Sequence, residues 1–293
     1  MGLGELVSIL AAVFWGLSVV FFRRSGETMP PFELNFVKNS IAIVLLIPTI
    51  LIAHGISIPS YSNTDLLLTI LSGLLGLAIA DTWYFKGLTY LGAARMGIVA
   101  TIYSPSVVTL STLFLGESLN AVQFLGMGLV LCGIVLVTWR QNRAEITTEA
   151  LRKGLFFGGL AVFLTAVGVI LVEGVLERQP FFWTTILRLL AGLAGMILFM
   201  LVRRGWSEFK TNLRKPHPWK TVILAAFLGS YLSMTLWLAG YKLINPSVAS
   251  VLNETASAFI VFFAWLILKE KISKQKLAGL FFTLLGVVVV VLN

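Results

Sequence analysis

The sequence has 293 residues, of which 58% are hydrophobic and only 12% are charged, and its mean hydropathy is +0.93. About a quarter of the residues in a soluble domain carry a charge, so this composition excludes an ordinary soluble protein. At about 20 apolar residues per membrane span, the chain could form about eight to ten spans, which leaves no room for a soluble catalytic domain. The 22 lysines and arginines outnumber the 13 aspartates and glutamates. Since most of these basic residues lie between apolar runs, they indicate orientation in a membrane rather than binding to nucleic acid.

The sequence predicts no metal ion, no other cofactor and no enzymatic activity. It has one cysteine, Cys132, inside an apolar run, and two histidines, His54 and His217, in connecting segments. It contains no His-Glu-x-x-His motif, no Gly-x-Gly-Asp motif and no nucleotide-binding glycine loop. The chain therefore lacks the residue groupings that a membrane hydrolase or a metal-dependent transferase needs.

Long apolar runs, interrupted by proline, glycine and charged residues, predict an all-α integral membrane protein. Runs of this length must be helices, because an unpaired backbone amide or carbonyl is costly in lipid. We expect ten transmembrane helices, at residues 3–22, 34–53, 66–86, 94–115, 121–139, 154–172, 181–202, 220–241, 247–268 and 274–292.

The two halves of the sequence are similar to each other. A shift of 153 residues places Gly76 on Gly229 and Glu117 on Glu270, and further glycines and leucines follow in the same register. Each half has five spans, and this odd number requires the second half to enter the membrane from the opposite face. Inverted repeats of this kind are common in secondary transporters, whose substrate sites lie near the membrane midplane between the repeats. We predict a first repeat at 1–139, a cytoplasmic linker at 140–153 and a second repeat at 154–293.

The basic residues predict the orientation of the chain. Apart from Lys38 and Arg188, which lie inside spans, nearly all lysines and arginines fall in the connections that follow the odd-numbered spans. The opposite side holds only Arg178 and Lys242. Connections rich in lysine and arginine stay in the cytoplasm. We therefore expect a multi-pass protein of the cell (cytoplasmic) membrane with both termini outside.

Short motifs recur in both halves. The first half has Phe14-Trp15-Gly16, Pro31 followed by Lys38, Ser104-Pro105, the run Leu113 to Glu117, Gln123, Gly126 and Gly133, and the second half has Pro180 followed by Arg188, the run Leu266 to Glu270, Gly279 and Gly286. Together these motifs resemble the EamA domain of the drug/metabolite transporter superfamily, present twice over the whole chain. The second half departs from the pattern with Thr165-Ala166, Asn253-Glu254 and Ala258.

The resemblance to EamA domains implies a fold and a function. It implies that the first four helices of each half surround a central cavity and that the fifth and tenth lie outside. It also implies substrates that range over amino acids, nucleotide sugars and drugs.

The glycines of the fifth and tenth spans recur every seven residues, which indicates close helix packing and could also support a dimer.

Four charged residues lie within predicted spans and away from the span ends, where a charge costs at least ~2.5 kcal/mol at the bilayer centre and needs a cavity or a partner. They are Lys38, Asp81, Arg188 and Glu254. One interpretation is structural: Lys38 pairs with Asp81 or extends to the membrane surface, and Arg188 pairs with Glu254. The other is functional: one base holds a substrate carboxylate or phosphate while an acid exchanges a proton during transport. Glu254 is the first candidate for this coupling and Asp81 the second.

Aromatic and amide side chains complete the predicted substrate cavity. Rings with a polar tip suit a wet pocket for organic molecules, although tryptophan and tyrosine also gather at membrane interfaces. The candidates besides the four charges are Trp15, Tyr84, Tyr103, Tyr231, Trp237 and Asn253.

These features favour a secondary transporter that exports a small organic metabolite, amino-acid-like or amphipathic, by alternating access. Its partners would be that substrate and the lipid bilayer, with no nucleic acid, and the chain would act as a monomer or a homodimer. A proton gradient, substrate exchange or the substrate gradient alone would drive transport. One alternative is a flippase or carrier for a lipid-linked or nucleotide-linked sugar. A second alternative is a membrane protein without transport activity.

The orientation gives a first test. Cysteines introduced one at a time within residues 142–150 and 207–214 should not react with a membrane-impermeant thiol reagent added to intact cells, because both segments are predicted to be cytoplasmic. The same cysteines should react after the cells are opened. Labelling from outside would reverse the predicted topology.

Overall fold

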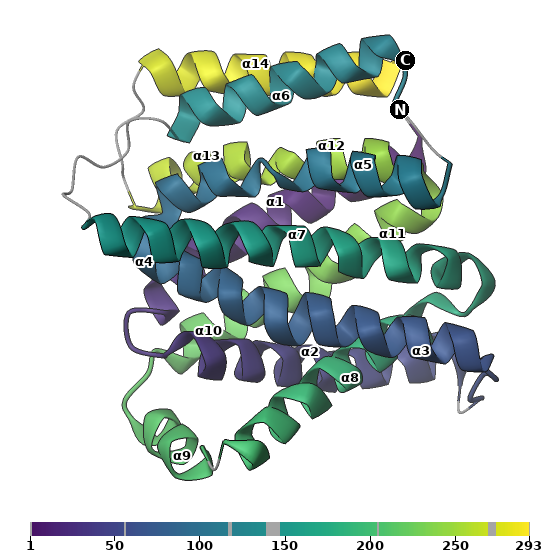
Figure 1. Ribbon diagram of the computed structural model, residues 1–293, viewed down its shortest axis with the longest axis vertical. Helices are drawn as coiled ribbons and strands as arrows, with labels where there is room; N and C mark the ends of the chain where they lie inside the picture. The colour runs from purple at the N-terminus through teal and green to yellow at the C-terminus, as the bar shows by residue number, and fades with distance from the viewer. Residues whose placement is uncertain are drawn as a thin grey trace.

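The computed structural model describes residues 2–55, 57–116, 119–138, 147–203, 205–268 and 274–292. Within these residues the ordered elements are all helices, and none is a strand. Most of the helices lie along one common direction and form a bundle (Figure 1). The predicted all-α fold is therefore confirmed.

The helices of the two halves follow the same order. The first half forms α1 (Leu3–Ser25), α2 (Pro31–His54), α3 (Asn63–Ser72), η1 (Gly73–Ala80), α4 (Asp81–Ala100), α5 (Tyr103–Phe114) and α6 (Ala121–Thr138). The second half forms α7 (Thr148–Arg178), α8 (Phe181–Val202), α9 (Trp206–Arg214), α10 (Trp219–Ala226), η2 (Phe227–Ser233), α11 (Met234–Leu243), α12 (Pro246–Glu254), α13 (Ala256–Leu268) and α14 (Lys274–Leu292). The elements η1 and η2 are π-helical segments, whose turns are wider than those of an α-helix.

Several helical segments are long and apolar enough to cross a membrane. In the part of the chain that the structure describes, there are seven such segments, at Leu3–Ser25, Pro31–Ala53, Asn63–Leu91, Thr148–Arg178, Phe181–Val202, Trp219–Leu243 and Pro246–Ile267. Two shorter apolar helices lie at Ala121–Leu136 and Leu277–Leu292. The multi-pass membrane fold is thus confirmed, whereas the count of ten spans remains a prediction.

Several helix boundaries differ from the sequence prediction, and side-chain contacts explain two of the differences. Helix α4 continues through residues 87–93, where a connection between the third and fourth spans was expected. Leu91 is buried there in a cluster with Met96, so packing favours the helix over a loop. Helix α7 begins at Thr148 rather than at 154, because the side chain of Thr147 accepts a hydrogen bond from the backbone N–H of Ala150 at 3.2 Å and caps the helix.

The end of the predicted linker, at 148–153, therefore belongs to α7. Residues 139–146, which form the rest of that connection, lie outside the described residues. The repeated glutamates Glu117 and Glu270 also lie outside them. The domain boundaries consequently stay a prediction.

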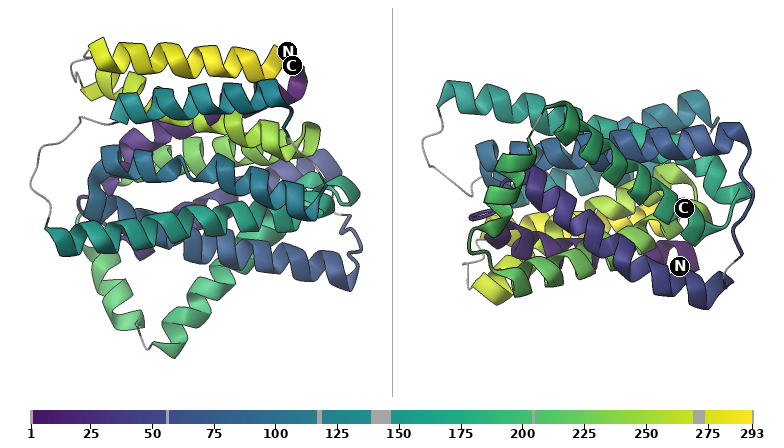
Figure 2. Two further views of the ribbon diagram at one scale, coloured as in Figure 1. Left: turned by 45° about the horizontal axis from the view of Figure 1, so that its top comes forward. Right: turned by 90° about the horizontal axis from the view of Figure 1, so that it is seen from below.

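Helix α9 is an element that the apolar runs did not predict. It forms an angle with the end of α8 (Figure 2). Its Phe209 is buried and packs edge-on against Phe36 of α2, with 5.0 Å between the ring centroids. Asn212 donates a hydrogen bond to the carboxylate of Glu33 at 2.6 Å. This short amphipathic helix therefore holds the α8–α10 connection against α2.

Helices α6 and α14 pack against each other along one edge of the bundle, outside the remaining helices (Figure 1). This is the position that the resemblance implied for the fifth and tenth spans. A Cβ atom built on Gly286 would lie 2.6 Å from the carbonyl oxygen of Gly126, so both positions require glycine for this close approach. The recurring glycines therefore serve packing within the chain.

The inner helices of the two halves interleave. Helix α1 packs on α10, η2, α11, α12 and α13 of the second half, and α7 packs on α3, η1, α4 and α5 of the first half. Helices α2 and α8 contact each other. The shift of 153 residues places Leu74 on Phe227 and Ala80 on Ser233, so the two π-helices occupy equivalent positions. The similarity between the halves thus extends from the sequence to the local backbone.

The connections alternate between the two ends of the bundle. The turn between α1 and α2 and the connection that contains α9 lie at the left of Figure 1. The α2–α3 and α7–α8 connections lie at the right, together with both termini. The described connections rich in lysine and arginine therefore share one end of the molecule.

The packing of α6 on α14 gives a second test. Gly286→Ala should lower the free energy of unfolding by about 1–3 kcal/mol, because its methyl group would overlap the backbone of α6. Gly128→Ala on the exposed side of α6 is the matched control, since no atom lies within 4 Å of its Cβ position. This control should be neutral or up to about 1 kcal/mol stabilising. The unfolding midpoint in detergent measures both, and equal effects would contradict the packing argument.

Candidate functional site

A cavity of about 220 Å³ lies among the inner helices, and residues of both halves line it. All the predicted cavity residues except Tyr231 are in its wall: Trp15, Lys38, Asp81, Tyr84, Tyr103, Arg188, Trp237, Asn253 and Glu254. The four charged residues that the sequence placed inside spans therefore share one cavity. Their role in transport remains a prediction.

Tyr231 is the predicted cavity residue that does not line the cavity. Its hydroxyl shares a hydrogen bond of 2.6 Å with the hydroxyl of Thr49 on α2. Its ring packs against that of Phe227, with the centroids 5.8 Å apart. The sequence placed Tyr231 in the correct helix, but the wide turn of η2 directs its side chain to α2.

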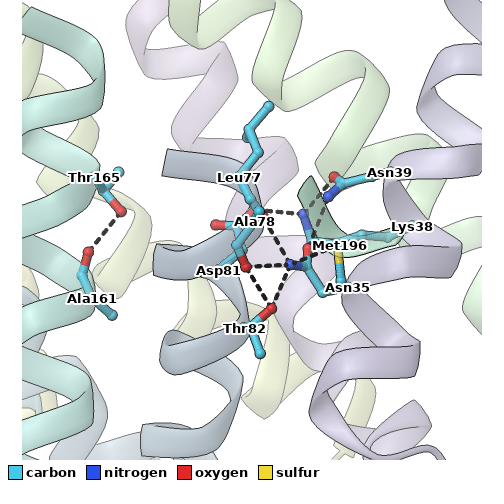
Figure 3. Close-up of polar contacts among 10 residues, drawn as sticks. All are labelled: Asn35, Lys38, Asn39, Leu77, Ala78, Asp81, Thr82, Ala161, Thr165 and Met196. Carbon is cyan, nitrogen blue, oxygen red and sulfur yellow. Dashed lines mark hydrogen bonds and ion pairs between the residues drawn. The ribbon is translucent and has the colours of Figure 1, made fainter. Parts of the chain in front are cut away.

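Lys38 and Asp81 form an ion pair across α2 and α4 (Figure 3). The distance from Lys38 Nζ to Asp81 Oδ2 is 2.6 Å, and Lys38 Nζ also donates to Asn39 Oδ1 at 3.0 Å. The side chains are 4% and 22% exposed. The ammonium of Lys38 is thus neutralised locally, as the structural interpretation of the sequence suggested.

A second polar contact in Figure 3 holds the π-helix η1 against α2. The side-chain amide of Asn35 donates to the backbone carbonyl of Leu77 at 2.8 Å and to the hydroxyl of Thr82 at 2.9 Å. Asn39 donates to the carbonyl oxygen of Asn35 at 3.0 Å. Wide π-turns disturb the regular backbone ladder, so an amide from a neighbouring helix can satisfy a carbonyl there. This contact positions Asp81, which directly follows η1.

Arg188 of α8 is almost fully buried, with 1% of its surface exposed. Its Nε donates to the hydroxyl of Ser72 at 2.8 Å, and that hydroxyl donates to the backbone carbonyl of Gly168. Its Nη1 has no hydrogen-bond partner among the described residues. No ion pair joins Arg188 to Glu254 within this part of the chain, so that predicted pairing is wrong.

Glu254 is the last residue of α12 and is 5% exposed. Its Oε1 accepts hydrogen bonds from the backbone N–H and the hydroxyl of Ser104, at 3.1 and 3.2 Å. Ser104 lies in the first turn of α5, where N–H groups have no partner within their own helix. A carboxylate is favoured at such a helix N-terminus. Glu254 finds its partner in this helix end and not in a basic side chain.

The contact between Glu254 and Ser104 joins two helix breaks. A turn at Thr101–Ile102 separates α4 from α5, and Thr255 separates α12 from α13. The shift of 153 residues places Ile102 on Thr255, so the breaks are equivalent in the two halves. The carboxylate of Glu254, beside the break between α12 and α13, therefore binds the first turn of α5, which begins at the other break.

Aromatic rings form much of the rest of the cavity wall. The Tyr103 hydroxyl shares a hydrogen bond of 2.5 Å with the hydroxyl of Tyr241, which is 1% exposed. The ring of Tyr103 packs on Trp237, with the centroids 6.5 Å apart, and Trp15 packs on Tyr84 at 6.4 Å. The wall thus combines apolar ring faces with charged and polar groups.

The cavity is also lined by several small polar residues that the sequence analysis did not select. They are Thr165, Ser230, Ser233 and Ser257. Serine and threonine are common in membrane helices, so residue type alone carries little signal. Ser257 could have been found, because the shift of 153 residues places it on Ser104. Among the described residues, no group of three histidines, cysteines or acids is placed to hold a metal ion.

Comparison with known proteins gives the family. The chain matches the model of the EamA-like transporter family at residues 2–139 and again at 152–292. An uncharacterized transporter of Archaeoglobus fulgidus is 24% identical to this chain over 98% of its length and 97% of the relative's. An uncharacterized protein of Methanocaldococcus jannaschii is 30% identical over 134 residues, which are 45% of this chain but 94% of that protein. A solved crystal structure with a TM-score of 0.78 and 18% identity covers 99% of this chain and 96% of its own, which shows a common fold.

The apolar helical bundle and these relatives define the protein as a multi-pass membrane transporter. The chain belongs to the EamA-like transporter family, as the motifs in its sequence suggested.

The buried ion pair gives a third test. Lys38→Met and Asp81→Asn should each lower the free energy of unfolding by about 3–5 kcal/mol, since each leaves a buried charge without its partner. The double variant should recover most of this loss. Lys153→Met is the control, because its pair with Glu149 is exposed and should leave the unfolding midpoint unchanged. Additive losses in the double variant would show that the two charges are not coupled.

Proposed function

We propose that the protein is a secondary transporter that exports a small organic metabolite, amino-acid-like or amphipathic, by alternating access. The observation that carries this proposal is the cavity: helices of both halves line it, and it contains buried charges of both signs. Charged residues inside membrane helices usually mark a substrate or ion pathway. Sites between two repeats are typical of secondary transporters.

The size of the cavity favours a small substrate. Pockets for drug-sized ligands measure about 300–1,000 Å³. A cavity of about 220 Å³ is smaller. This volume suits an amino acid better than a nucleotide-linked sugar. We therefore place the sugar carrier second.

Polar contacts between the halves would serve as gates for alternating access. Asp65 of α3 accepts hydrogen bonds from Arg178 Nη2 at 2.8 Å and Gln179 Nε2 at 3.0 Å, near the α7–α8 connection. Near the other end of the bundle, Glu33 of α2 binds Asn212 of α9. Each contact joins a helix of the first repeat to the second. Opening the cavity to one side would break one contact and keep the other.

The proposal includes the setting of transport. We infer two inverted five-helix repeats in the cytoplasmic membrane with both termini outside, because the described basic connections share one end of the bundle. Transport would use a proton gradient, substrate exchange or the substrate gradient alone. The chain would act on its substrate without chemical conversion, as a monomer or a homodimer.

Glu254 is the proposed coupling residue. Its carboxylate links the two equivalent helix breaks through Ser104, in the cavity that would hold the substrate. Protonation of this carboxylate would weaken its bonds to the N–H and hydroxyl of Ser104, since a neutral acid is a poorer acceptor. The two breaks would then be free to move relative to each other. Substrate or proton binding could in this way change which side of the cavity is open.

This coupling gives a fourth test, in proteoliposomes without ATP. The wild type should accumulate at least one amino acid of a panel when a proton gradient is imposed. Glu254→Gln should reduce gradient-driven accumulation by about tenfold or more while it retains exchange, because the amide keeps the shape but does not titrate. Glu177→Gln, the same change at an exposed position of α7, should behave as the wild type.

Three outcomes would contradict the proposal. Accumulation that requires ATP would exclude secondary transport. Transport of nucleotide sugars in place of amino acids would favour the second candidate. Wild-type rates and pH dependence in Glu254→Gln would remove Glu254 from coupling and move the role to Asp81.

A further inference from the structure

We propose that Arg188 is the substrate-binding residue for a carboxylate, so that the transported molecule is a small organic acid or amino acid held by its carboxylate. This inference rests on the proposed function, since it concerns the same cavity. It assigns substrate binding to Arg188, and it assigns a carboxylate group to the substrate.

Three of the four cavity charges have their partners inside the protein. Lys38 and Asp81 neutralise each other at 2.6 Å. Glu254 accepts two hydrogen bonds from Ser104. Arg188 differs, because among the described residues its Nε donates to the neutral hydroxyl of Ser72 and its Nη1 has no hydrogen-bond partner.

An arginine in this state is costly unless an anion joins it. Buried polar atoms are nearly always hydrogen-bonded, and a buried charge without a counter-charge carries a large desolvation penalty. Asp81 attracts Arg188 electrostatically, but its carboxylate is bound by Lys38. The planar guanidinium has five N–H donors and matches a carboxylate with two parallel hydrogen bonds. A carboxylate ligand would supply both the missing charge and the missing acceptor.

The local backbone holds the guanidinium in place. A Cβ atom on Gly73 would overlap the backbone carbonyl of Arg188, so η1 and α8 are in direct contact there. The Cβ position of Gly76, which also lines the cavity, lies 3.6 Å from Arg188 Nη2. The hydroxyl of Ser72, the residue just before η1, accepts the hydrogen bond from Nε of Arg188. Arg188 is therefore oriented before a ligand binds, which reduces the entropy cost of binding.

The rest of the wall indicates what the carboxylate is attached to. Rings of Trp15, Tyr84, Tyr103 and Trp237 line a cavity of about 220 Å³. Such a wall suits an apolar or aromatic group of modest size. One base without an acidic partner suits a single negative charge better than the double charge of a phosphate. The substrate class is thus a monocarboxylate with an apolar side group.

Binding by the purified full-length protein in detergent tests this assignment. The probes are phenylalanine, leucine and 3-phenylpropionate, the amide of each, and phenyl phosphate, and the readout is the shift of the thermal unfolding midpoint with ligand concentration. The wild type should bind at least one acid and prefer it to its amide. Arg188→Gln should lower the apparent affinity for the acid by about tenfold or more and abolish this preference.

Two further variants keep the result interpretable. Arg188→Lys keeps the positive charge but loses the two-pronged donor geometry, so it should bind the acid with intermediate affinity. It provides the comparison if Arg188→Gln does not fold. Arg214→Gln removes a charge from the exposed part of α9 and should keep wild-type binding.

The assignment fails if no acid stabilises the wild type, if both Arg188 variants keep wild-type affinity for the acid, or if phenyl phosphate binds better than the acids. Counterflow of the radiolabelled acid across proteoliposomes separates this inference from the proposed function. If acid binding depends on Arg188 but no counterflow is observed, the assignment of Arg188 as the binding residue stands and the proposed transport function is wrong. If neutral compounds show counterflow and Arg188→Gln leaves it unchanged, the proposed transport function stands and the assignment of Arg188 is wrong.

Discussion

Charges inside a membrane protein need partners within the protein, because lipid supplies neither water nor counter-ions. This constraint accounts for the arrangement of the cavity. Lys38 pairs with Asp81, and the carboxylate of Glu254 binds the N-terminus of α5 through Ser104. Arg188 forms no ion pair among the described residues, and its Nη1 has no acceptor there. Of the four cavity charges, Arg188 is therefore the one proposed to bind a ligand.

Irregular backbone in the inner helices lines part of the cavity. The π-helices η1 and η2 and the breaks at Thr101–Ile102 and Thr255 interrupt regular hydrogen bonding at equivalent points of the two halves. Asn35 satisfies a carbonyl of η1, and Glu254 satisfies an N–H of α5. Non-helical backbone at membrane depth is tolerated where it is buried in protein or lines a cavity. Of these two polar side chains, that of Glu254 lines the cavity where a substrate would be.

The outer helices α6 and α14 and the inner helices differ in their packing and therefore in their roles. Helices α6 and α14 contact each other through glycines at one edge of the bundle, and none of their described residues lines the cavity. The inner helices interleave, so that α1 lies against the second half and α7 against the first. A displacement of one half must therefore change the cavity wall on both sides. This geometry suits a protein that opens the same cavity alternately to two faces.

The sequence by itself determined the helical membrane fold, the similarity of the halves and the family, because apolar run length and repeat register are local or periodic signals. It also selected the four charged residues of the cavity wall, since charges such as Lys38 and Glu254 are rare inside spans. Only the tertiary structure decided the partners: Glu254 binds Ser104 and not Arg188, and Tyr231 turns to Thr49. Those choices depend on helix rotation, on the wide turns of η1 and η2 and on distances between segments far apart in the chain, which no spacing in the sequence encodes.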